Sequence, residues 1–136
     1  MHILDLGLQQ IHQALLDKKI TIEELVQESL KRAKELQKET NAFVTILEED
    51  ALAQAKAYQQ NLSKDNLFYG IPIAIKDNFS TQGILSTGSS NILKNYVPIF
   101  ESTVTQKLKE AHAINIGKTV LDELAMGGSG CTGNTG

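Results

Sequence analysis

The feature that most constrains the fold of this chain is a short apolar run that ends abruptly in charge. Residues 70–78 read Gly-Ile-Pro-Ile-Ala-Ile-Lys-Asp-Asn, so no charged side chain interrupts the run before Lys76. Unbroken apolarity over so short a length is typical of a strand buried on both faces of an α/β sheet. The period of two along a strand places Lys76 on the face opposite to the three isoleucines.

The rest of the chain alternates between helical and extended patterns. Apolar spacing predicts a hairpin of two amphipathic helices, the first around residues 4–15 and the second opening at Thr21 with an S/T-x-x-E capping box. In a later helix, Val104 and Leu108 are predicted to face the core. Strands alternating with helices indicate the α/β class. The further predicted elements are strands over residues 43–47 and 113–117, and helices over residues 48–60, 101–111 and 121–126.

Composition excludes several classes of protein. The net charge is −3 and Arg32 is the one arginine, so the chain offers no cationic patch of the kind that nucleic-acid binding needs. One cysteine, Cys131, excludes an internal disulfide and a multi-cysteine zinc site, and we expect no metal site in this chain. No stretch approaches the roughly 20 apolar residues of a membrane span, and the first residues do not resemble a signal peptide. We therefore expect a cytoplasmic protein with no membrane contact.

Lys76 is the leading candidate for a catalytic residue. It follows directly on the apolar run, at the carboxyl end of a predicted strand, where open α/β sheets place ligands and catalytic groups. Partial desolvation at such a place makes a lysine release its proton more readily, and a neutral lysine is a competent general base. The alternative is a lysine that simply leaves the sheet into solvent.

Three motifs that suggest other chemistry are incomplete. Residues 117–119 read Gly-Lys-Thr like the end of a phosphate-binding loop, but His112 occupies the position where that loop needs glycine. Residues 128–133 match G-x-G-x-x-G without a strand before them, so we do not expect dinucleotide binding. Cys131 and His112 could form a thiol–imidazole pair, although a lone cysteine in a glycine-rich loop more often has no catalytic role.

The order of several segments resembles the amidase signature family. The run at residues 70–78 is similar to the strand that carries that family's catalytic lysine, and the similarity extends from the first helix to Gly127. The chain departs from the family pattern at Val120, where asparagine is usual. The other matching segments are residues 86–89 (Ser-Thr-Gly-Ser), 117–119 (Gly-Lys-Thr) and 122–127 (Asp-Glu-Leu-Ala-Met-Gly), while residues 41–44 and 51–56 are typical of the glutamyl-tRNA(Gln) amidotransferase A subunits within the family.

The resemblance implies a fold and a site. Residues 1–136 would form the N-terminal part of a single domain with the amidase-signature fold, a mixed β-sheet flanked by helices with an N-terminal helical hairpin. Lys76 would be the lysine of a Ser–cis-Ser–Lys triad whose two serines lie beyond Gly136, so the chain alone would be inactive. Met126 and Ser129 resemble the family's substrate-side loop and would contact glutamine.

The resemblance also implies a reaction and partners. Glutamine hydrolysis would supply ammonia for the conversion of Glu-tRNA(Gln) to Gln-tRNA(Gln). This chain would need no cofactor, whereas the complex would use ATP and Mg²⁺. Its partners would be the B and C subunits of the amidotransferase, with tRNA held mainly by the former. Two alternatives stay open: a stand-alone amidase of the same family that acts on small or fatty amides, and a catalytically incomplete interaction module built on the N-terminal helices.

Glycine is concentrated at the end of the sequence. Five of the ten glycines lie in residues 127–136. Glycine-rich backbone loses the most conformational entropy on ordering and builds no core by itself. A domain ending there would end within a loop, so we interpret the chain as the N-terminal part of a longer protein.

Overall fold

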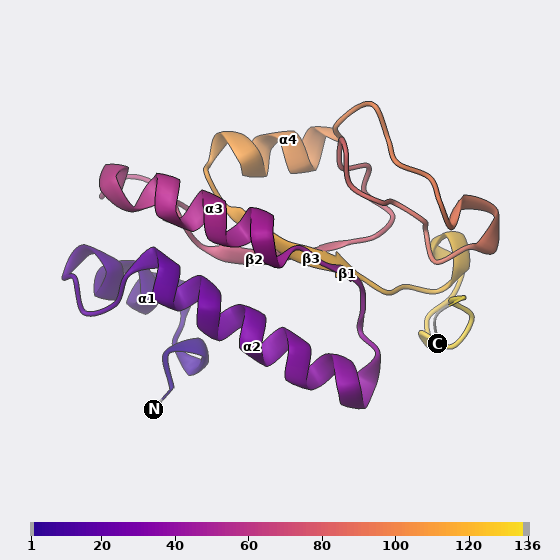
Figure 1. Ribbon diagram of the computed structural model, residues 1–136, viewed down its shortest axis with the longest axis horizontal. Coiled ribbons are helices and arrows are strands. Elements are labelled where there is room, and N and C mark those ends of the chain that lie inside the picture. Colours follow the sequence, from indigo (N-terminus) through magenta and orange to yellow (C-terminus); the bar gives the residue numbers. More distant parts are fainter. Residues whose placement is uncertain (1, 135–136) are drawn as a thin grey trace.

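Helices and strands alternate along the chain, which confirms the predicted α/β class. The computed structural model describes residues 2–134 (Figure 1). The elements in chain order, with η for a 3-10 helix, are η1 (Ile3–Asp5), α1 (Leu8–Leu16), α2 (Ile22–Thr40), β1 (Phe43–Ile46), α3 (Glu48–Tyr58), η2 (Gln59–Asn61), β2 (Pro72–Lys76), η3 (Asn91–Leu93), α4 (Thr103–Glu110), β3 (Ile114–Thr119) and η4 (Glu123–Ala125).

The predicted start of the second helix is confirmed in atomic detail. Thr21 caps α2, because its hydroxyl accepts a hydrogen bond from the main-chain N–H of Glu24 at 3.1 Å. In return the Glu24 carboxylate accepts from the main-chain N–H of Thr21 at 2.9 Å. This reciprocal capping box satisfies two N–H groups that a helix end otherwise leaves without partners. The helix therefore begins where the sequence pattern places it.

The three strands form one mixed sheet in the order β1–β3–β2. The central strand β3 pairs antiparallel with β1 and parallel with β2. In the parallel pair Lys76 lies opposite Thr119, and Ile75 lies opposite Lys118. The predicted mixed sheet with flanking helices is thus confirmed. The carboxyl ends of β2 and β3 lie side by side, at the same end of the two strands.

The prediction that β2 is buried on both faces is wrong for the part of the chain that the structure describes. The strand lies at the edge of the sheet, and Ala74 and Lys76 are exposed. Ile75 is 7% exposed, so the predicted period of two holds. The exposure of Ala74 and Lys76 leaves the other face open toward the carboxyl end of the strand within residues 2–134.

The apolar core lies between the helices and the sheet. Helix α3 lies between α2 and α4 in Figure 1 and contacts both α2 and β3. Small side chains on α3, Ala51 and Ala55, are fully buried and allow this close approach. The buried core side chains are Leu15, Ile22, Leu25, Val26, Leu30, Ala33, Ala51, Ala55, Tyr69, Ile71, Ile114 and Ile116.

Two further sequence predictions need correction. On α4 the fully buried side chain is that of Thr105, while Val104 is 50% exposed and does not face the core. Thr105 is buried because its hydroxyl donates to the main-chain oxygen of Ser80. The helix predicted over residues 121–126 is one 3-10 turn, interrupted by a positive φ of 52° at Leu124.

Two polar segments, residues 77–102 and 120–134, gather near the carboxyl ends of β2 and β3, on the right in Figure 1. Hydrogen bonds between main-chain groups join the two segments. Leu124 N–H donates to the oxygen of Gly88 at 2.8 Å, and Asn134 N–H donates to that of Ser89 at 3.0 Å. No helix among the described residues is long and apolar enough to cross a membrane.

Candidate active site

Lys76 is the last residue of β2 and lies where the polar segments meet the sheet. Its main-chain oxygen accepts from Phe79 N–H at 3.1 Å, which turns the chain out of the strand. Its side chain is exposed and forms no ion pair within residues 2–134. The expected desolvation of Lys76 is therefore not found in the described part of the chain. The predicted position at the strand end is confirmed.

The next residue, Asp77, is buried instead, with an exposed fraction of 1%. Its main-chain N–H donates to Thr119 at 3.0 Å and so extends the pairing of β2 with β3 by one residue. One carboxylate oxygen, Oδ2, accepts from the N–H and from the hydroxyl of Thr87. The other, Oδ1, lies 3.3 Å from the ammonium nitrogen of Lys118. Asp77 thus turns into the protein while its neighbour Lys76 turns out.

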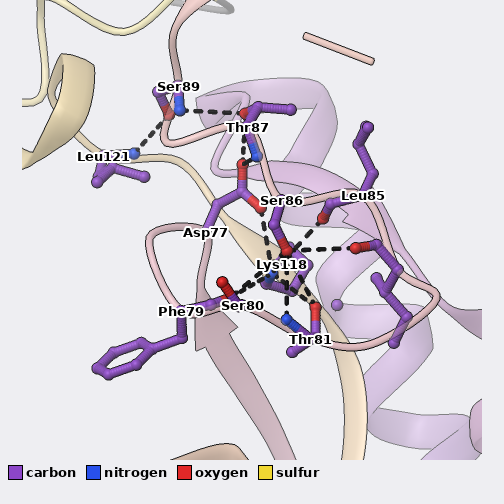
Figure 2. Close-up of polar contacts among 12 residues, drawn as sticks. Asp77, Phe79, Ser80, Thr81, Leu85, Ser86, Thr87, Ser89, Lys118 and Leu121 are labelled. Carbon is purple, nitrogen blue, oxygen red and sulfur yellow. Dashed lines mark hydrogen bonds and ion pairs between the residues drawn. The ribbon is translucent and has the colours of Figure 1, made fainter. Parts of the chain in front are cut away.

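Lys118 lies at the centre of this arrangement and is completely buried (Figure 2). Besides Asp77, its ammonium group faces two hydroxyls, Thr81 Oγ1 and Ser86 Oγ, each at 2.9 Å. It also donates to the main-chain oxygen of Phe79 at 3.0 Å. Buried charges persist in proteins when they are paired and hydrogen-bonded, and every one of these acceptors comes from the segment that follows Lys76.

A chain of hydrogen bonds leads from this pair to the residues that follow β3. Thr87 donates to Asp77, and its hydroxyl accepts from Ser89 N–H at 3.0 Å. The Ser89 hydroxyl accepts from Leu121 N–H at 3.1 Å, three residues after Lys118 (Figure 2). The network is closed, because it begins and ends in the same segment of chain. It fixes the turn at residues 86–90, which is buried throughout.

Burial and charge act on Lys118 in opposite directions. Burial disfavours the charged ammonium and lowers the pKa of Lys118 below its ordinary value. The carboxylate of Asp77, and after it that of Glu101, opposes this lowering. Glu101 has a cation of its own, Lys109, at 3.4 Å. The charge that chiefly balances Lys118 is therefore that of Asp77.

A second carboxylate organises the glycine-rich loop. Asp122 Oδ2 accepts from the main-chain N–H groups of Ser129 and Gly130, each at 2.9 Å. Its Oδ1 accepts from the N–H and the hydroxyl of Thr132. The bonds from Gly130 and Thr132 are the main cause that lowers the pKa of Asp122 to about 2. Gly127 lies so close that an added Cβ would come within 2.6 Å of this carboxylate.

The predicted substrate residues lie on this loop. Ser129 is exposed and its N–H is bound to Asp122, while Met126 is 83% exposed. No hydrogen bond or ion pair of the described chain joins either residue to Lys76. Their contact with glutamine stays a prediction. A nearby open pocket of about 260 Å³ is lined by Asp77, Asn78, Ser80, Ser86, Gly88, Leu93, Tyr96, Leu124 and Ala125.

The sequence analysis missed the roles of Lys118 and Asp77. Residues 117–119 were of interest as a possible phosphate loop, but they lie inside β3 with the lysine buried among oxygen atoms of this chain. The available signal was a lysine directly after an apolar strand pattern, which requires an acidic partner when buried. Nothing in the spacing identifies Asp77 as that partner. Cys131 and His112 form no pair: Cys131 is exposed, and His112 stacks on Tyr69 at 5.1 Å.

The fold and the site at the carboxyl end of β2 define a class of protein, and comparison with known sequences identifies that class. Residues 24–136 match the sequence profile of the family described as Amidase. This match covers most of the chain, which therefore belongs to the amidase family.

Particular relatives are known by name. The chain is 48% identical over 130 residues to the glutamyl-tRNA(Gln) amidotransferase A subunit of Pediococcus pentosaceus, covering 95% of this chain and 27% of that protein. It is 46% identical over 130 residues to the protein of the same name from Streptococcus pneumoniae, with the same coverage. The chain thus spans about a quarter of the length of these curated relatives.

Solved structures show the same fold. The crystal structure of the glutamyl-tRNA(Gln) amidotransferase A subunit from Thermotoga maritima matches with a TM-score of 0.73 and 35% identity, covering 98% of this chain and 27% of that one. An amidase family protein from Bacillus anthracis matches with a TM-score of 0.82 and 25% identity over 89% of this chain and 25% of that one. The predicted fold, the N-terminal part of the amidase-signature fold, is confirmed.

Proposed function

We propose that residues 1–136 are the N-terminal part of the amidase domain in the glutamine-hydrolysing subunit of an aminoacyl-tRNA amidotransferase. The whole enzyme would convert Glu-tRNA(Gln) to Gln-tRNA(Gln), a step of translation that belongs in the cytoplasm. The observation that carries the proposal is the position of Lys76 at the carboxyl end of β2. It lies in a chain that is 48% identical, over 95% of its length, to a relative that bears the name of such an amidotransferase.

The proposed chemistry is acyl transfer to a serine. A serine hydroxyl is a weak nucleophile until a base takes its proton. Neutral Lys76 would accept that proton through a second serine, while the first serine attacks the side-chain amide carbon of glutamine. The C–N bond then breaks, and ammonia leaves with the proton that the Lys76 ammonium returns. Water releases glutamate from the acyl-enzyme, and both serines would come from sequence beyond residue 136.

Exposure of Lys76 within residues 2–134 is compatible with this role. On the face of β2 that carries Lys76, both Ala74 and Lys76 are exposed within residues 2–134. Residues beyond the chain that bring the serines to Lys76 would also cover this face and remove water from the amine. Desolvation favours the neutral form of a lysine, which is the form a general base requires. Met126 and Ser129 would contact glutamine from the loop that Asp122 organises.

ATP and Mg²⁺ would act on another subunit of the complex. Gly117, Lys118 and Thr119 belong to β3, and the Lys118 ammonium is engaged by oxygen atoms of this chain. These residues do not fit a phosphate site, so we propose no ATP site in this chain. We propose the B and C subunits of the amidotransferase as partners, with tRNA bound mainly by the former. The net charge of −3 with a single arginine accords with that division.

Substitution of Lys76 in the intact amidotransferase tests the proposal. We expect Lys76→Ala and Lys76→Arg each to lower the glutaminase rate by at least about a hundredfold, because a general base contributes about 10²–10⁴-fold. Arginine keeps the positive charge but stays protonated, so it cannot act as a base. The reaction driven by added ammonia bypasses glutamine and should survive in both variants.

Two controls make this test decisive. Lys31→Arg, on the exposed face of α2, should leave both reactions unchanged, and all variants must co-purify with their partner subunits. A Lys76→Arg enzyme that keeps most of its glutaminase rate would show that Lys76 is a fixed cation, and the proposed base would be wrong. Residues 1–136 alone should release no ammonia from glutamine above a heat-treated control.

A second candidate is a stand-alone amidase. One observation favours it: the fold matches the Bacillus anthracis amidase family protein with a TM-score of 0.82, against 0.73 for the Thermotoga maritima amidotransferase chain. Purification of the native protein separates the two functions. Association with two further subunits supports the amidotransferase, whereas a free protein that hydrolyses small amides and ignores glutamine supports the amidase.

A further inference from the structure

The residue that follows the proposed base carries a negative charge. Asp77 is joined directly to Lys76, and although the two side chains turn to opposite sides, the carboxylate lies on the order of 10 Å from the Lys76 amine. An unbalanced carboxylate at that distance favours the protonated form of a lysine, which is the wrong form for a base. The structure balances this carboxylate with the completely buried ammonium of Lys118, at 3.3 Å.

We propose that Lys118 is a positioning residue for Lys76, holding Asp77 buried and neutralising its charge beside the base. The inference rests on the proposed function, because it assumes that Lys76 must be neutral to act. It concerns a residue that touches neither substrate nor the reacting atoms.

The geometry restricts Asp77 from both sides. Its Oδ1 faces Lys118, and its Oδ2 is occupied by the N–H and hydroxyl of Thr87 (Figure 2). The main chain of Asp77 is also fixed, since its N–H donates to Thr119 and its oxygen accepts from Gly88 N–H at 3.1 Å. The carboxylate therefore cannot rotate toward the Lys76 side of the strand without breaking this network.

The charged groups around the pair are few. Glu101 acts on Lys118 from the start of α4, and its own carboxylate is paired with Lys109 at 3.4 Å. Lys76 has no ion-pair partner among residues 2–134. The neutral acceptors around Lys118 are the hydroxyls of Thr81 and Ser86 and the main-chain oxygens of Phe79 and Leu85. Asp77 and Lys118 are thus the charged pair that acts on the protonation of Lys76.

The test measures the protonation of Lys76 directly in the full-length protein that carries this segment. Brief acetylation with acetic anhydride at a series of pH values, followed by mass spectrometry of the Lys76 peptide, gives the pH at which the amine becomes reactive. In Lys118→Met the carboxylate is unbalanced, so we expect this pH to rise by about half a unit or more. In Asp77→Asn the buried Lys118 amine loses the carboxylate that opposes the lowering of its pKa, so it releases its proton and we expect no rise. The double variant should return near the wild type.

A rise in Lys118→Met that is absent from Asp77→Asn distinguishes charge compensation from a merely structural role, which would move both single variants alike or neither. Lys34→Met removes a lysine from a surface ion pair with Glu48, at 2.6 Å, and is the matched control with no expected shift. Circular dichroism confirms folding, and if Asp77→Asn fails to fold, the double variant takes its place in the comparison with Lys118→Met. Folded variants that lack this difference overturn the inference. If the wild-type protein hydrolyses no glutamine, the proposed function is overturned instead. The labelling result still tests whether Lys118 compensates the charge of Asp77 beside Lys76.

Discussion

The two ends of the molecule are stabilised by different kinds of interaction. At the helical end, Ile22, Leu25 and Val26 are completely buried among other apolar side chains. At the carboxyl ends of β2 and β3, the completely buried side chains include those of Lys118 and Ser89, each held by hydrogen bonds. Apolar packing is non-directional and tolerates substitutions that conserve volume. A buried polar network demands every partner, because one unpaired group costs its full desolvation.

This contrast indicates where the protein is adaptable and where it is not. The helical core can change residue by residue, provided that its volume is kept. The polar end holds the segment that follows Lys76 in one geometry. It does so through the Asp77–Lys118 ion pair and through the side chains of Thr81, Ser86, Thr87 and Ser89. A site that depends on exact geometry is thus placed on the rigid polar side. Substitutions at the two ends should therefore differ in their cost and in their tolerance of similar residues.

The heaviest loss of stability should follow removal of the buried cation. Lys118→Met leaves Asp77 buried and unpaired, and breaking a buried ion pair in this way costs about 3–5 kcal/mol. Urea unfolding of the full-length protein should show a correspondingly lower midpoint. The double variant Asp77→Asn with Lys118→Met removes both charges and should recover most of that loss. No recovery would mean that the pair is net stabilising, and the contrast with the apolar end would weaken.

A core substitution at the helical end should cost somewhat less. Leu25→Ala removes a completely buried side chain, for which the loss is about 2–5 kcal/mol. Leu25→Met conserves volume and should cost less than about 1.5 kcal/mol. The same urea measurement applies, with Leu36→Ala as the control, because Leu36 is 37% exposed on the same helix. Equal losses for Met and Ala at position 25 would contradict the adaptable core.

The mildest effect is expected at Asp122 and is local. Its pKa is lowered to about 2 by the bonds from Gly130 and Thr132, so the carboxylate stabilises the folded loop. Because this pKa lies below the ordinary value of 3.8, the stabilisation is complete above about pH 4 and is lost as the pH falls toward 2. Hydrogen exchange at the amides of Ser129 and Thr132 should accelerate over that window.

The Asp122→Asn variant sharpens this measurement. It should show the fast exchange already at pH 6, because the amide offers fewer acceptor positions than the carboxylate. Amides in α2 serve as the internal control and should keep their protection. Equal acceleration in α2 would indicate global unfolding and would show that the loop is not an independent unit.

Much of the fold could be predicted from local patterns. The capping box at Thr21 placed the start of α2, and the apolar spacing of that helix identified its buried face. The two short strands and the helices between them followed from period and composition. The position of Lys76 at the end of β2 was predicted in the same way. These features depend on residues a few positions apart, which is the range over which backbone geometry repeats.

The predictions that failed concern neighbours from distant parts of the chain. Val104 has a suitable spacing for the core, but Thr105 is buried instead because it bonds to Ser80. Apolar composition alone suggested that β2 is covered on both faces, whereas Ala74 and Lys76 on one face are exposed within residues 2–134. In each case the pattern described the segment correctly and said nothing of what lies beside it.

Local sequence patterns were enough to predict the class of fold, the start of α2 and the candidate base Lys76. The three-dimensional arrangement was needed to show that Asp77 turns inward, that Lys118 is buried against it, and that the turn at residues 86–90 closes the network. The physical reason is that a charge pair between distant residues depends on the register of β2 against β3. That register brings Ile75 and Lys118 opposite one another, and no local pattern along either strand encodes it.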